Sequence, residues 1–212
     1  MAEIKIYGTS HISQESIDLI ERAIEEDQPD LVAIELDQLR LNGLMSNKPA
    51  QTGNIFIKLI QVFQRHLGKK TGVMPGDEML KAYNKSLENG IDVALIDRDI
   101  RITIAKLKQV SRKEKVKAFA SLILSPIISQ KIEITRIPDD QLINQMTEQV
   151  KQRYPQIYNA LIDERDQYMA ERLKILSEER TSSKITVFVG AGHKKGIQKY
   201  LQTQTQHKVV IN

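Results

Sequence analysis

Short apolar runs alternate with longer amphipathic segments along this chain. Wholly or mostly apolar runs of four or five residues are typical of strands buried on both faces of a sheet. Strands are therefore predicted at 4–8, 31–34, 93–96 and 185–189, with a last short strand at 208–211. Between them, apolar residues recur at helical spacing. Because strands alternate with helices, the pattern predicts an α/β fold with a mostly parallel sheet flanked by helices.

The segments between the strands differ in length and order. Helices are predicted at 12–26, 55–67, 76–89, 155–179 and 194–201, and a loop at 42–53. Residues 101–153 are charged, helical in character and weakly organised. We expect a single domain over 1–212, in which a helical insertion at about 101–180 interrupts a core formed by about 1–100 and 181–212.

Two segments far apart in the chain share one pattern. A strand, a glycine, two small residues, a histidine and a helix follow one another at Gly8 to His11 and again at Gly190 to His193. Ligands of open α/β sheets bind beyond the carboxyl ends of the strands, where both histidines are expected. A helix N-terminus favours the neutral imidazole that a metal ligand or a general base requires. The two glycines are expected to allow a sharp turn and a close approach of ligand to backbone. The alternative is that each histidine simply completes its turn.

The other predicted strands also end in ionisable residues. Glu35 follows the first wholly apolar run, and Asp97 and Asp99 follow the second. Two histidines and a carboxylate can hold a divalent ion and leave one position open for water. We therefore predict that His11, Glu35 and His193 bind a divalent ion such as Mn, Co or Zn. For Asp97 and Asp99, exposure of a strand end to solvent explains the charge equally well.

An arginine interrupts the apolar face of the helix predicted at 155–179. The apolar stripe of this helix consists of Ile157, Leu161, Tyr168, Met169, Leu173 and Leu176. Arg165 lies in the middle of the stripe, with Arg172 on the same face. A buried arginine needs a carboxylate or an anionic ligand. Arg165 is therefore expected to bind a substrate carboxylate, to orient Glu35, or to form a purely structural ion pair.

Composition excludes several chemistries. The 212 residues include no cysteine, which excludes thiol catalysis, disulfides and cysteine zinc sites. The absence of tryptophan disfavours base stacking, and the net charge of +4 comes from dispersed clusters, so no nucleic-acid partner is expected. No signal peptide and no apolar run long enough to cross a bilayer is recognised, so we expect a cytoplasmic protein.

Taken together and in this order, the motifs resemble those of the TraB family of pheromone-shutdown proteins, within the wider group of TIKI metalloproteases and GumN proteins. The matching segments are 8–11, 34–37 with Arg40, 76–79, 96–100, 164–166 with Met169, and 190–193. The resemblance implies a hydrolase-like site built from His11, Glu35, Arg165 and His193, with a peptide as substrate. It also implies substrate-binding roles for Arg40, Glu78 and Arg98 beside the two glycines, Gly8 and Gly190.

The chain departs from the family pattern in three respects. Many relatives have asparagine where this chain has Asp166, which places an additional negative charge beside Arg165. Family members often continue into a hydrophobic C-terminal membrane region, so a longer full-length protein is expected to associate with a membrane. Glu78 lies opposite the apolar face of its predicted helix, so helical periodicity does not predict its burial.

Three functions agree with these residues. The first is a metal-dependent hydrolase, a peptidase in which metal-bound water attacks the substrate and Arg165 stabilises the oxyanion. The second is a peptide-binding module that sequesters its ligand without cleaving it. The third is a metal-independent hydrolase in which a histidine acts as the general base. The apolar residues at 55–63 fit the face of a homodimer, a lid or plain core.

Overall fold

The strands of this protein form one parallel sheet. The computed structural model describes residues 2–10, 14–46, 76–124, 140–204 and 209–210. Within these residues the strand order is β3-β2-β4-β1-β5, and every strand pair is parallel. The strands are β1 (Glu3–Thr9), β2 (Leu31–Ile34), β3 (Asp92–Leu95), β4 (Lys184–Gly190) and β5 (Val209–Val210). The predicted α/β fold with a mostly parallel sheet is confirmed.

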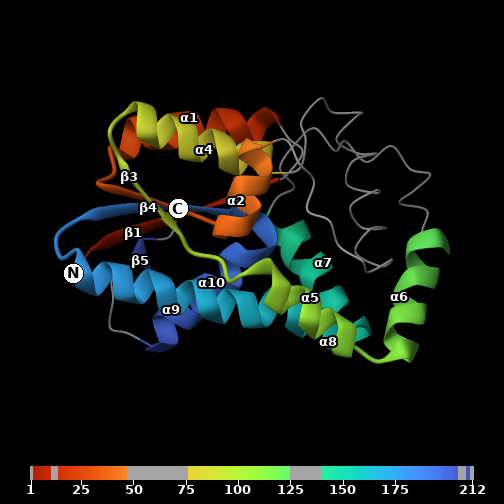
Figure 1. Ribbon diagram of the computed structural model, residues 1–212. Coiled ribbons are helices and arrows are strands. Elements are labelled where there is room, and N and C mark those ends of the chain that lie inside the picture. The colour runs from red at the N-terminus through yellow and green to blue at the C-terminus, as the bar shows by residue number, and fades with distance from the viewer. Residues whose placement is uncertain (1, 11–13, 47–75, 125–139, 205–208, 211–212) are drawn as a thin grey trace.

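Helices connect the strands and cover both faces of the sheet. Figure 1 shows α1 and α4 on one face and α9 and α10 on the other. The helices are α1 (Gln14–Asp27), α2 (Gln38–Met45), α4 (Asp77–Glu88), α5 (Ile100–Gln109), α6 (Arg112–Leu124), α7 (Asp140–Arg153), α8 (Pro155–Tyr158), α9 (Glu164–Glu179) and α10 (Ala191–Gln204), with a π-helical turn, η2 (Asn159–Asp163), between α8 and α9. No helix among these described segments is long and apolar enough to span a membrane.

Alternating residues of the strands form two separate cores. In β2, Val32 and Ile34 face α1 and α4, whereas Leu31 and Ala33 face α9 and α10. This alternation follows from the two-residue period of a strand, and it explains why the strands are apolar on both faces. Phe188 of β4 is fully buried on the side of α1 and α4. Because helices cover both faces of the sheet, the strand ends are the places where a ligand can reach polar groups of the strands.

The segment after β2 is helical where the sequence pattern predicts a loop. Helix α2 covers 38–45, although its residues show little amphipathic order. Its start is stabilised by Asp37, whose carboxylate accepts hydrogen bonds from the backbone N–H groups of Leu39 and Arg40 at 2.9 and 3.0 Å. The expected loop therefore begins later than 42, and the helix predicted at 55–67 lies outside the described residues.

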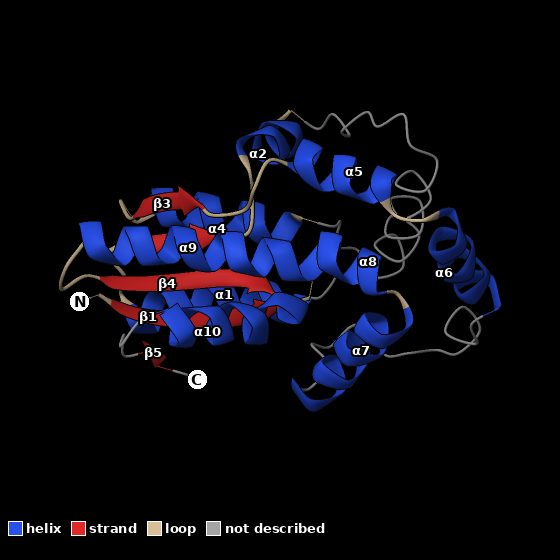
Figure 2. Ribbon diagram, turned by 90° about the horizontal axis from the view of Figure 1, so that it is seen from below, coloured by secondary structure: helices blue, strands red, loops and turns tan. Residues whose placement is uncertain are grey.

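The helices between β3 and β4 do not all lie away from the sheet. Buried residues of α5, α6, α8 and η2 form a third cluster. Figure 2 shows α5, α6 and α8 at the end of the molecule remote from β3. Helix α9, in contrast, contributes Met169, Leu173 and Leu176 to the core on the sheet. Helix α9 thus packs with the sheet although it falls within the expected insertion at 101–180. The division of the chain into core and insertion stays a prediction.

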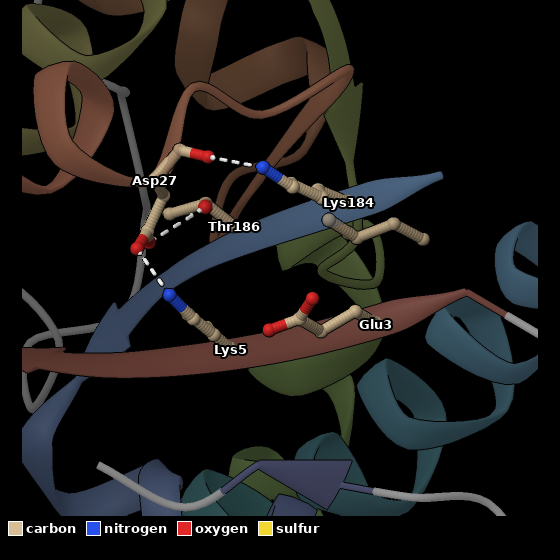
Figure 3. A pocket seen from close by; sticks show the side chains of 6 residues that line it. Glu3, Lys5, Asp27, Lys184 and Thr186 are labelled. Carbon is tan, nitrogen blue, oxygen red and sulfur yellow. Dashed lines mark hydrogen bonds and ion pairs between the residues drawn. The ribbon is translucent and has the colours of Figure 1, made fainter. Parts of the chain in front are cut away.

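A polar cluster connects β1 and β4 to the end of α1 near the amino ends of the strands. This is the side of the sheet opposite the candidate site. The buried carboxylate of Asp27 accepts hydrogen bonds from Lys5 at 2.6 Å, from Tyr7 at 2.9 Å and from Thr186 at 3.0 Å. Figure 3 shows Lys5, Asp27 and Thr186 among the residues that line a small cavity of about 10 Å³. That volume is about one water molecule, so the cavity is too small for an organic ligand.

Candidate active site

A π-helical turn breaks the long predicted helix just before Arg165. The backbone N–H of Glu164 bonds to the carbonyl oxygen of Asn159, five residues earlier, instead of to that of Ala160. The wider turn changes which residues face inward: Asp166 is 1% exposed, whereas Tyr168 of the predicted apolar stripe is 38% exposed. The expected placement of Tyr168 in the stripe is therefore wrong, because a regular helical wheel does not account for the additional residue in the turn.

Arg165 lies at the centre of the candidate site. Its Nε donates to both carboxylate oxygens of Asp97 at 3.2 Å, and its Nη2 donates to Glu35 and, at 2.6 Å, to Asp97. Its Nη1 donates to the carbonyl oxygen of Leu161 and to Nε2 of His193, both at 3.0 Å. All five N–H groups of the guanidinium therefore face an acceptor within the protein. Burial lowers the pKa of Arg165, but the two carboxylates outweigh this effect and raise it.

Glu35 joins the ends of two neighbouring strands. The residue follows β2 and is 3% exposed. Its Oε2 accepts a hydrogen bond of 2.7 Å from the backbone N–H of Gly190, the last residue of β4. Its Oε1 accepts from Arg165 and lies 3.4 Å from Nε2 of His193. The parallel pairing of β2 with β4 thus brings together Glu35, Gly190 and His193, three residues that sequence analysis selected from distant segments.

The tautomer of His193 follows from its two neighbours. An arginine nitrogen can only donate, so Nε2 of His193 accepts from Arg165 and carries a lone pair. The proton of the neutral ring is then on Nδ1, which donates to Oδ1 of Asp166 at 2.5 Å. A carboxylate on the far nitrogen fixes the orientation of the ring. Nε2 is therefore prepared to accept a proton or to bind a cation.

Asp97 and Arg40 extend the charged network towards α2. Arg40 donates to both Asp37 and Asp97 through its side chain and to the carbonyl oxygen of Glu35 at 3.2 Å. Asp97 thus lies between two arginines, Arg40 and Arg165. Asp97 was expected to be an acidic strand end and was not included in the predicted site. What the sequence did not show is that two arginines, one from α2 and one from α9, meet at this strand end.

Arg98 lies beside the site rather than in it. The side chain is 7% exposed and donates to Thr103 at 3.0 Å, to Glu164 at 2.7 Å and to the carbonyl oxygen of Ala160 at 2.8 Å. The last contact takes the place of the helical bond that the π turn removes from Ala160. Arg98 therefore holds the turn that precedes Arg165. The expected contact of Arg98 with substrate stays a prediction, and the structure shows its guanidinium bonded to these protein groups.

Gly8, Gly190 and Glu78, for which substrate-binding roles were predicted, contact other parts of the protein. Gly8 packs against the first turn of α10, where a Cβ atom would lie 3.0 Å from Cα of Ala191, so protein rather than ligand approaches its backbone. Neither Gly8 nor Gly190 has the positive φ of a sharp turn. Glu78 is fully buried and accepts a hydrogen bond of 3.1 Å from the backbone N–H of Gly76, a burial that helical periodicity did not predict. A capping contact at the helix start, unlike core packing, is not periodic.

Asp99 stabilises the start of α5 at this end of the sheet. Its side chain caps α5 by accepting a hydrogen bond of 2.8 Å from the backbone N–H of Arg101, and it pairs with the guanidinium of that residue. These hydrogen bonds lower the pKa of Asp99 to about 2. The pair is exposed to solvent and does not contact Asp97 or Arg165.

Two of the three predicted metal ligands are described. His11 lies outside the described residues, as do His66 and His207, whereas Glu35 and His193 lie side by side. Two ligands of one tetrahedral ion at about 2.1 Å are about 3.4 Å apart, which is the separation of these two atoms. Arg165, however, donates to both of them. Among the described residues no group of three metal-binding side chains is formed, and a guanidinium stands where the ion would be.

Negative charge exceeds positive charge in this cluster. Among the described residues, the carboxylates of Glu35, Asp37, Asp97 and Asp166 are paired with the guanidinium groups of Arg40 and Arg165. Four carboxylates against two arginines leave an excess of two acidic groups in a largely buried volume. Such a volume favours the binding of a cationic group of a ligand or of a metal ion.

The carboxylate of Asp166 is expected to make the free energy of unfolding depend on pH. Burial raises its pKa to about 6, although its hydrogen bond with His193 acts in the opposite direction. The unfolded chain releases this proton near pH 4, and the folded protein retains it up to about pH 6. The free energy of unfolding is therefore expected to fall by about 2 kcal/mol as the pH rises from 4 to 6. Asp166→Asn is expected to remove this contribution and to stabilise the protein above pH 6.

Urea unfolding of the wild type and of Asp166→Asn from pH 4 to pH 8 measures this effect. The difference between the two curves reports the substitution at Asp166, since titrating groups that do not contact this residue behave alike in both proteins. The amide oxygen of the substituted side chain can still accept the hydrogen bond from Nδ1 of His193, which preserves the packing. Parallel curves for the two proteins across this pH range would contradict the prediction.

The comparison of this chain with known proteins agrees with the family resemblance of its motifs. A model of the TraB/PrgY/gumN family matches residues 2–211. An uncharacterized protein of Methanocaldococcus jannaschii is 37% identical over 94% of this chain and 53% of its own length. TraB domain-containing proteins of Bos taurus and Homo sapiens are each 27% identical, over 93% and 95% of this chain and 62% and 63% of their lengths. The chain thus spans less than two thirds of each relative. The family resemblance read from the motifs is confirmed, and the chain belongs to the TraB/PrgY/gumN family.

Proposed function

We propose that this protein is a hydrolase of peptides in which His193 is the base that activates water. The observation that carries the proposal is the fixed tautomer of His193, with Nδ1 on Asp166 and the lone pair of Nε2 directed at the charged cluster. A base oriented by a carboxylate is the arrangement that proton abstraction from water requires. The support for a peptide as the substrate class is the resemblance of the motifs to those of pheromone-shutdown proteins.

The proton transfer and the stabilisation of the oxyanion are coupled in this arrangement. Water reaches Nε2 when substrate binding opens the contact of 3.0 Å between Arg165 and His193. The same opening frees the N–H group on Nη1 of Arg165, which donates to the oxyanion that forms on the substrate carbonyl when Nε2 takes the proton of the attacking water. The new imidazolium lies between Asp166 and Glu35, whose negative charges stabilise it.

A metal-dependent form of the same reaction uses His11, Glu35 and His193 as ligands. The spacing of Glu35 and His193 fits one ion, but Arg165 must first leave both atoms. An ion held there would supply a nucleophilic water at neutral pH. The described arrangement, with Arg165 on both atoms, favours the metal-independent form. A sequestering module that binds a peptide without turnover is the remaining alternative.

Elemental analysis and a peptide-cleavage assay separate these alternatives. The purified protein is offered Mn, Co or Zn, and metal content and cleavage of a peptide library are measured before and after chelation. Cleavage that survives chelation supports the metal-independent hydrolase. Stoichiometric metal that is lost in His11→Ala and His193→Ala, together with chelation-sensitive cleavage, would replace it with the metal-dependent form. Stoichiometric peptide binding without turnover would refute both hydrolases.

A further inference from the structure

Gly196 lies against the carboxylate that orients His193. His193 and Gly196 are three positions apart on α10, so they share one face of the helix, and that face packs on α9. A Cβ atom at position 196 would lie 1.9 Å from Oδ2 of Asp166 and 2.7 Å from its Cγ. Neither distance is attainable between atoms that are not bonded. The absence of a side chain at Gly196 is therefore what admits the Asp166 carboxylate.

The carboxylate has little room to move elsewhere. Asp166 is 1% exposed and is held between α9 and α10, with Oδ1 on Nδ1 of His193. A methyl group at position 196 would have to turn the carboxylate, and this movement would break the hydrogen bond that fixes the ring. Helix propensity opposes a glycine here, because Gly196 is an interior residue of a helix that runs from 191 to 204. Local helix stability therefore favours alanine, and the contact with Asp166 favours glycine.

We propose that Gly196 is a positioning residue of the active site: by admitting the Asp166 carboxylate it fixes His193 as the tautomer with its lone pair on Nε2. The role in catalysis rests on the proposed function, whereas the effect on the histidine ring does not. Gly192 provides a matched control in the same helix. A Cβ atom there would meet its nearest neighbour, Oγ1 of Thr147, at 4.0 Å, which is an ordinary contact.

A double-mutant cycle tests the proposal without an activity assay. Gly196→Ala is made in the wild type and in Asp166→Ala, and thermal unfolding is measured for the four proteins. We expect the substitution to lower the melting temperature of the wild type and not that of Asp166→Ala, where the carboxylate is absent. Gly192→Ala is expected to leave the melting temperature unchanged or to raise it. Equal losses from Gly196→Ala in both backgrounds would overturn the proposal.

Nitrogen NMR of the imidazole ring reads the tautomer directly. The ¹⁵N signals of His193, identified by their absence in His193→Asn, are expected to show Nδ1 protonated in the wild type and in Gly192→Ala. In Gly196→Ala and in Asp166→Ala this preference is expected to be lost. An unchanged tautomer in Gly196→Ala would also overturn the proposal.

Activity separates the positioning role from the proposed function. Gly196→Ala is expected to lower kcat for the cleaved peptide by at least tenfold, with no further loss in the Asp166→Ala background. If peptides are cleaved and Gly196→Ala retains the wild-type kcat, the proposal on Gly196 fails and the hydrolase stands. If no peptide is cleaved but the cycle and the NMR signals behave as expected, the hydrolase fails and the positioning of His193 stands.

Discussion

His193→Asn is expected to lower kcat for peptide cleavage by about 10²–10⁴-fold, the usual contribution of a general base. The amide of asparagine can still donate a hydrogen bond to Asp166, but asparagine has no basic nitrogen in the place of Nε2. Packing around the buried Asp166 is thus largely retained, and the loss reports on proton transfer. The measurement is the initial rate of cleavage at saturating peptide, with circular dichroism as the check on folding.

The control for this substitution is Asp99→Asn. Asp99 is an acidic residue of the same sheet edge, but it caps α5 and pairs with the exposed Arg101. Asparagine is an equally good capping residue, so fold and kcat are expected to stay at the wild-type level. A folded His193→Asn variant with kcat within threefold of the wild type would show that His193 is not the base.

Arg165→Met is expected to destabilise the protein by about 3–5 kcal/mol, as breaking a buried ion pair does. Removal of the guanidinium leaves Glu35, 3% exposed, without the arginine and leaves Asp97 with Arg40 as its remaining cationic partner. Arg165→Lys is expected to recover part of this loss, since an ammonium group keeps the charge but supplies three donors instead of five. Urea unfolding at pH 7 measures the free energies of unfolding.

Two further variants show whether the loss arises from unpaired charge. Glu35→Gln combined with Arg165→Met removes one carboxylate together with the cation, so the double variant is expected to be more stable than Arg165→Met alone. Arg101→Met removes an arginine from an exposed pair and is expected to leave stability within experimental error. A cost for Arg165→Met as small as that of Arg101→Met would mean that the network around Arg165 does not hold the site together.

Much of the site could be selected from the sequence because strand ends are recognisable. Apolar runs at 31–34 and 185–189 locate the strands, and polar residues that follow them are brought to one edge by parallel pairing. Glu35 was found in this way, and His193 was found through the pattern that 190–193 shares with 8–11. Arg165 was found because a charged residue interrupts an apolar helical face. Each of these signals can be read from short segments of the sequence.

The residues that were missed or misplaced depend on contacts between distant segments. Asp166 faces inward because a π turn alters the helical phase, and that turn is accommodated by Arg98, which follows β3. Asp97 is selected by arginines of α2 and α9. Gly8 lies against α10, so the space expected for a ligand is filled by Ala191. None of these contacts leaves a periodic mark in the sequence.

The α/β class, the strands, the family and the edge of the sheet where polar residues meet can all be read from the amino-acid sequence. These features follow from residue periods and from motifs whose members are close together in the chain. The pairing of the charges is visible in the folded chain alone: Arg165 with Glu35 and Asp97, and Asp166 with His193 in the space that Gly196 leaves. An ion pair or a steric fit depends on distances of a few ångströms between segments, and strand order and helix phase set those distances.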